Sequence, residues 1–118
     1  DSISKFHSDS QMIPLREEAY DTSNGVDLGE ETLDNVFRLR PQAKHLTIFE
    51  NKKTNSTLFI EQSSIDFPFL VVFAPENESC LAIEPMTANT DAFNTGDGLI
   101  ELAPSEAFSG QIRLSIGK

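Results

Sequence analysis

The chain has 118 residues, of which 19 are acidic and 9 are basic, so its formal net charge is −10. A field of that sign repels phosphate backbones and anionic lipid headgroups, and we therefore expect neither nucleic acid nor a membrane surface as a partner. The longest uninterrupted apolar run, residues 69–74, is far shorter than the roughly 20 residues needed to cross a bilayer. The length fits one domain with a modest core.

The first third of the chain alternates between strand-like and loop-like stretches. Residues 11–21 contain one apolar cluster interrupted by Pro14, which predicts an edge strand or an extended segment and not a central strand, because proline cannot donate to a ladder. The polar, glycine-containing residues 22–31 predict a loop. The apolar pattern restarts in residues 32–40, where Asp34 stands near the beginning. From spacing alone, Asp34 would be a turn or cap residue.

The middle of the chain predicts a hairpin. Residues 45–50 and 56–62 are strand-like runs, and the five polar residues 51–55 connect them. His45 opens the first run and is expected at the surface, because metal binding would need further ligands that the neighbouring sequence does not offer.

A second pair of strands is predicted in the stretch of residues 67–94. Two apolar runs, residues 67–74 and 80–83, flank the polar segment 75–79, which predicts two strands joined by a turn. The only cysteine, Cys80, opens the second run, and a buried, reduced thiol is the expectation for it.

A carboxylate follows the second of these runs. Glu84 precedes Pro85, which removes a ladder donor and biases Glu84 toward extended backbone, so we expect the carboxylate where the strand ends. One reading of Glu84 is an exposed charge at a strand end. The other is a ligand-binding group, because the following loop mixes polar groups with apolar ones and suits a small polar ligand. In that reading Glu84 is partly buried against Met86 and Phe93.

The last part of the chain predicts two further strands separated by a turn. Residues 99–102 form a short apolar run, and residues 110–116 alternate, with apolar side chains on one side, which predicts a half-buried strand. No long segment has a helical period, and no HExxH or CxxC motif is present. The pattern is typical of an all-β, antiparallel sandwich or barrel without a metal site.

Four motifs together resemble a known family. The segments FLVVFAP, CLAIEPMTANTDAFN and GLIELAPSE follow one another, and TLDNVFRL precedes them. In this order they resemble the C-terminal part of the aldose 1-epimerase (galactose mutarotase) family. The resemblance implies that residues 1–118 are the C-terminal portion of a large antiparallel β-supersandwich. It further implies an isomerase that interconverts the α and β anomers of a hexose by acid/base ring opening, without a cofactor.

The resemblance also implies roles for three residues. Glu84 matches the general base that takes the proton from the anomeric hydroxyl, Asp34 matches the aspartate that binds sugar hydroxyls, and Asn94 is a further substrate-binding residue. The family's general acid is a histidine, and neither His7 nor His45 falls at its position. We therefore expect a missing N-terminal segment or a second chain to complete the sandwich, and this chain alone to be inactive or nearly so.

Three alternatives remain open at this point. A hexose-6-phosphate 1-epimerase would need a cluster of basic side chains, and the arginines at positions 16, 38, 40 and 113 are scattered. A non-catalytic carbohydrate-binding β-sandwich would keep the fold without the acid, and a structural β domain would bind nothing. The single cysteine favours a reducing compartment, so the cytoplasm is the expected location.

Overall fold

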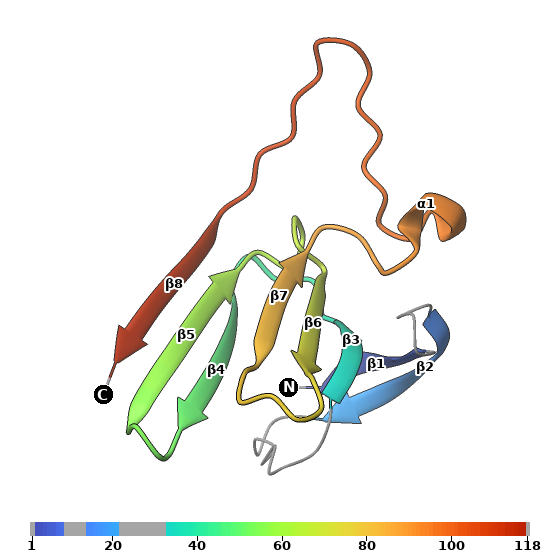
Figure 1. Ribbon diagram of the computed structural model, residues 1–118. Coiled ribbons are helices and arrows are strands. Elements are labelled where there is room, and N and C mark those ends of the chain that lie inside the picture. Colours follow the sequence, from blue (N-terminus) through green and yellow to red (C-terminus); the bar gives the residue numbers. More distant parts are fainter. Residues whose placement is uncertain (1, 9–13, 22–32, 118) are drawn as a thin grey trace.

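The computed structural model describes residues 2–8, 14–21 and 33–117 (Figure 1). The expected loop at residues 22–31 lies outside the described residues. Within them the chain forms eight strands and one short helix: β1 Ser2–Ser8, β2 Pro14–Asp21, β3 Leu33–Arg38, β4 His45–Asn51, β5 Ser56–Gln62, β6 Phe69–Ala74, β7 Ala82–Met86, α1 Ala92–Thr95 and β8 Ile112–Gly117.

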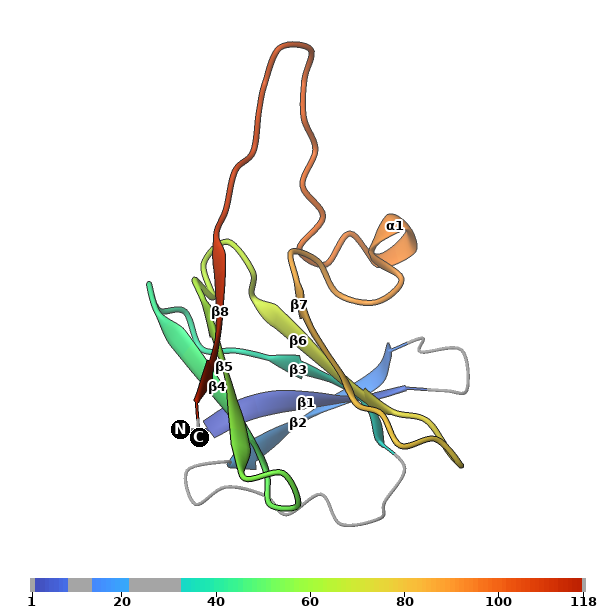
Figure 2. The same ribbon diagram turned by 60° about the vertical axis from the view of Figure 1, so that its left-hand side comes forward.

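The strands form two antiparallel sheets. The larger has the order β2-β1-β3-β6-β7 and the smaller has the order β4-β5-β8, and the smaller sheet lies beside the larger one (Figures 1 and 2). The predicted all-β, antiparallel class is thereby confirmed. In the part of the chain that the structure describes, no helix combines the length and apolar character that crossing a membrane requires.

Both predicted hairpins are confirmed. In the first, β4 pairs with β5 from His45 opposite Gln62, and Asn55 in the turn has a φ of 53°. In the second, β6 pairs with β7 and the turn contains Asn77 with a φ of 64°. Asparagine tolerates this left-handed conformation better than most residues, so the polar turn sequences suit the hairpins. β2 lies at an edge of its sheet, as its proline predicts.

Two expectations about the second hairpin are wrong. β7 continues through Glu84 and Pro85, so the carboxylate lies inside the strand and not at its end. The proline is tolerated because β7 is an edge strand, where a missing donor breaks no second ladder. Cys80 precedes β7 in the turn and is exposed, not buried, because the ladder starts only at Ala82.

The last part of the chain also differs from expectation. Residues 99–111, here called the arm, form no strand and project away from both sheets (Figures 1 and 2). The strand expected at residues 99–102 is therefore wrong. β8 does form and alternates as predicted, but Ile112, Leu114 and Ile116 are 41%, 64% and 77% exposed, so the strand is not half-buried. No layer of the described chain covers these three side chains, here called the apolar row.

The main cluster of buried apolar side chains lies on one face of the larger sheet. Val36, Phe69 and Val71 are at most 2% exposed, and Met86 packs against them. These residues come from the neighbouring strands β3, β6 and β7, and burying apolar surface of this kind is the main source of folding free energy.

A buried amide ties the two sheets together. Gln62, at the end of β5, is 1% exposed, and its Nε2 donates to the backbone oxygen of Phe67 at 2.9 Å and to that of Phe69 at 3.4 Å. Nearby, the buried Ser64 accepts a hydrogen bond from the backbone N–H of Gln42 at 2.8 Å and donates to the backbone oxygen of Arg40. These bonds fix the segments that enter β4 and β6, and so the position of β6 beside β3.

Candidate functional site

The pairing of β3, β6 and β7 arranges nine side chains in three rows. Residues directly opposite each other in antiparallel strands point to the same face of the sheet. The register therefore gives one face, here called the carboxylate face, with these rows: Asp34, Phe73 and Ala82; Val36, Val71 and Glu84; Arg38, Phe69 and Met86. The two carboxylates singled out from the sequence thus lie on one face of one sheet, with β6 between them.

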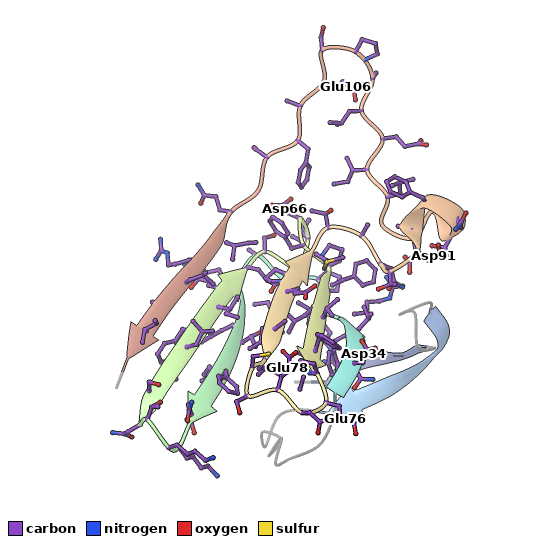
Figure 3. The ribbon with its side chains drawn as sticks, in the orientation of Figure 1. Asp34, Asp66, Glu76, Glu78, Asp91 and Glu106 are labelled. Atoms are coloured by element: carbon purple, nitrogen blue, oxygen red, sulfur yellow. The ribbon has the colours of Figure 1, made fainter. Side chains whose placement is uncertain are left out.

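Asp34 lies within β3 (Figure 3), so the turn or cap interpretation is wrong. Its Oδ1 atom is buried and has no hydrogen-bond partner. Desolvation by the surrounding protein raises the pKa of the Asp34 carboxyl above its ordinary value. Buried acceptors are normally paired, and leaving one unpaired costs folding free energy.

Glu84 is exposed on the edge strand β7, next to the nearly fully buried Val71. The expected burial against Met86 and Phe93 is not found. Met86 packs into the core, and Phe93 is 93% exposed because Ala92 is the buried residue of the short helix α1. The carboxylate of Glu84 is therefore accessible to a ligand at the open edge of the carboxylate face.

Asn94 is not brought together with the other two residues. It lies on α1, is exposed, and donates from Nδ2 to Oδ1 of Asp91 at 2.6 Å. Figure 3 shows Asp91 beside α1, well away from Asp34 on β3. The observed role of the Asn94 side chain is to hold the turn around Asp91, whose φ of 63° is left-handed.

Three polar residues to which the sequence assigned no joint role meet at the end of the carboxylate face. Arg38 forms an ion pair with Asp97, with 2.7 Å between Nη2 and Oδ2. Asn89 donates from Nδ2 to the same oxygen at 2.9 Å. Desolvation acts to raise the pKa of Asp97, but the hydrogen bonds from Asn89 and Arg38 and the charge of Arg38 outweigh it, so this pKa lies below its ordinary value. Side chains alternate between the two faces of a strand, so the sequence of β3 alone could have predicted that Arg38 lies on the same face as Asp34.

His45 lies outside this face. It opens β4 in the smaller sheet, where its Nδ1 lies 3.1 Å from Nε2 of Gln42, and partial burial lowers the pKa of the imidazole. Among the residues that the structure describes, no three or more His, Cys, Asp or Glu side chains gather in a group that could hold a metal ion.

The fold and the site define a protein of two antiparallel sheets, whose larger sheet carries two carboxylates on one face with β6 between them. A scan against models of known protein families, a search of curated proteins and a search of solved structures each found no match.

Proposed function

We propose that this chain carries the base and the sugar-binding carboxylate of an aldose 1-epimerase, which interconverts the α and β anomers of a hexose. The observation that supports this most is Asp34: a buried carboxylate oxygen without a donor, on the same face as the accessible carboxylate of Glu84. Apolar side chains of β6 lie between the two carboxylates. Phe73 is 37% exposed and can contact the C–H groups of a sugar, whereas Val71 and Phe69 are buried in the core.

In this proposal the sugar hydroxyls donate to the carboxylate of Asp34, and Glu84 removes the proton from the anomeric hydroxyl. An acid protonates the ring oxygen, the ring opens, the bond to C1 rotates, and the two roles reverse on closing. No cofactor is needed. His45, the histidine whose side chain the structure describes, lies on the smaller sheet and cannot serve as this acid. The proposal therefore assigns the acid to a segment or chain other than β4.

We infer that a missing N-terminal segment or a second chain supplies that acid and completes a galactose-mutarotase-like β-supersandwich. The exposed apolar row on β8 supports this, because an uncovered apolar strand at the edge of a sheet normally has a partner. The cytoplasm is the proposed location, since a reducing compartment suits the exposed free thiol of Cys80.

Polarimetry with fresh α-glucose and α-galactose tests the proposal. We expect the 118-residue chain alone to leave mutarotation near the buffer rate, and a polypeptide extended upstream of Asp1 to accelerate it well above that rate. In the extended polypeptide, Glu84→Gln should lower kcat about 100-fold or more, the usual contribution of a general base. Glu101→Gln, which changes an exposed glutamate on the arm, is the matched control and should have no effect. An extended polypeptide no faster than buffer would refute the proposal.

A non-catalytic carbohydrate-binding protein is the second candidate, and the exposure of Glu84 favours it, because an accessible carboxylate can bind a sugar without acting on it. Hexose binding by calorimetric titration without accelerated mutarotation would identify this function. A hexose-6-phosphate 1-epimerase has less support. Arg38 is paired with Asp97, and Arg113 lies on the smaller sheet, so neither offers a phosphate site beside Asp34.

A further inference from the structure

We propose that Arg38, Asn89 and Asp97, together called the clasp, are positioning residues that hold residues 87–98 as a wall at the end of the carboxylate face, and that hexose binding depends on this wall. The inference rests on the proposed function and extends it, because none of the three residues has a role in the reaction itself. They act through the loop that directly follows β7, the strand of Glu84.

The contacts of the clasp join residues far apart in the sequence. Arg38 and Asp97 are 59 positions apart, and their side chains lie 2.7 Å from each other while remaining about one-third exposed. Asn89 is only 5% exposed, and it bonds Asp97 twice: its side chain donates to Oδ2 at 2.9 Å, and its backbone N–H donates to the backbone oxygen at 3.0 Å. The carboxylate of Asp97 therefore holds the two ends of the loop together through Asn89 and attaches the loop to β3 through Arg38.

The loop also packs directly on the core. The guanidinium of Arg38 lies 4.7 Å from the centre of the Phe69 ring, a distance at which cation and ring attract each other. A Cβ atom on Gly98 would come within 2.9 Å of Cε2 of Phe69 and 3.1 Å of the Cα of Ala88. The absence of a side chain at Gly98 is thus what lets the loop approach this ring.

The place of the clasp on the sheet connects it with both carboxylates. Arg38 lies on the same strand and the same face as Asp34, and its row, which ends in Met86, is the neighbour of the row that ends in Glu84. Strands rise about 3.4 Å per residue, so neighbouring rows on one face are about 7 Å apart. A shift of the loop would therefore move the backbone on one side of Glu84 and open the end of the face.

A clasp that only stabilised the fold would not change the affinity of the folded protein for sugar, and this difference can be measured. The variants are Arg38→Met, Asp97→Asn and the charge-conserving Arg38→Lys, in the extended polypeptide used for polarimetry. The matched control is Arg113→Met on β8, which removes an exposed arginine from the other sheet. Two quantities are measured well below the unfolding temperature: hydrogen exchange of the Asn89 backbone amide, and the Kd for glucose and galactose.

We expect Arg38→Met and Asp97→Asn to speed exchange at Asn89 at least tenfold and to weaken hexose binding at least tenfold. Arg38→Lys should restore part of both, and Arg113→Met should change neither. Faster exchange with unchanged affinity would overturn the positioning role and leave a structural one, and unchanged exchange would overturn the clasp itself. A wild-type protein that binds no hexose would instead refute the proposed function, and the positioning role with it.

Discussion

At the scale of single residues, Asp34 combines a cost to stability with the role in sugar binding that we propose for it. Its Oδ1 is buried without a donor, and desolvation raises the pKa of the carboxyl. The ionised form is therefore disfavoured in the folded protein relative to the unfolded chain. An unpaired buried group of this kind needs a physical explanation, such as strain, a functional role, or an ordered water or ion.

Replacing this carboxylate should stabilise the chain while removing sugar binding. Because the folded pKa of Asp34 lies above the unfolded value, its protonated form favours folding, and stability is lost as the pH rises through the folded pKa. The variant Asp34→Asn has no carboxyl to ionise at this position, so it does not lose this stability as the pH rises. We expect a higher urea midpoint than wild type at pH 7, with a difference that shrinks as the pH falls toward the ordinary value of 3.8.

The matched control for that comparison is Glu106→Gln, an exposed acid at the tip of the arm (Figure 3), which should show no such pH-dependent gain. Urea unfolding at pH 3, 5 and 7 measures the difference for both variants. Equal midpoints for wild type and Asp34→Asn at every pH would show that the buried oxygen costs nothing.

The sequence singled out Asp34 and Glu84 by the short motifs TLDNVFRL and CLAIEPM, and the structure places both on one face of one sheet, while their roles stay a prediction. The clasp could not be found in this way. Arg38 and Asp97 are 59 positions apart, and no local pattern indicates which of the 19 acidic residues an arginine on β3 will meet. Burial of Glu84 was expected from its neighbours in sequence, but Phe93 turns outward on α1, which only the three-dimensional structure reveals.

At the scale of elements, local chemistry predicted the hairpins and failed at the arm. The turns of both hairpins contain an asparagine with a positive φ, and alternation fixes the flanking strands, so all the information is close in sequence. Residues 99–102 are equally apolar but have no partner strand beside them. A strand needs a partner strand for its backbone hydrogen bonds, and the sequence of one strand does not show whether a partner lies beside it.

The two glycines at the end of the loop allow a matched test of its packing. Gly96 and Gly98 have φ values of 74° and 76°, so alanine at either position pays the cost of left-handed backbone, about 1–2 kcal/mol. A Cβ on Gly96 meets nothing within 4 Å, whereas one on Gly98 overlaps Phe69. We expect Gly98→Ala to lower the free energy of unfolding more than Gly96→Ala does, as measured by urea denaturation. Equal losses would contradict the close contact.

At the scale of the whole molecule, a net charge of −10 coexists with an uncovered apolar row on β8. The alternation of residues 110–116 correctly predicts that one side of the strand is apolar. It cannot predict what covers that side, because the covering layer is not part of the strand's own sequence. Strand patterns in the sequence therefore predict an antiparallel β fold, but they do not predict which sheet faces cover each other.

The apolar row should make the 118-residue chain bind hydrophobic dyes. We expect anilinonaphthalene sulfonate fluorescence with this chain and a decrease when Leu114 and Ile116 are changed to threonine. Ile65→Thr is the matched control, because Ile65 is 67% exposed but lies between β5 and β6, away from the row. Fluorescence that responds equally to the control would place the dye elsewhere.

The arm has a consequence for the integrity of the smaller sheet. It is almost entirely exposed, and among the described strands β8 pairs with β5 alone. A protease that cut the arm would leave β8 attached by its ladder and no longer by a peptide bond. The severed strand could then dissociate, and a synthetic peptide of the same sequence could pair with β5 in its place. The chain is therefore suited to fragment complementation at β8.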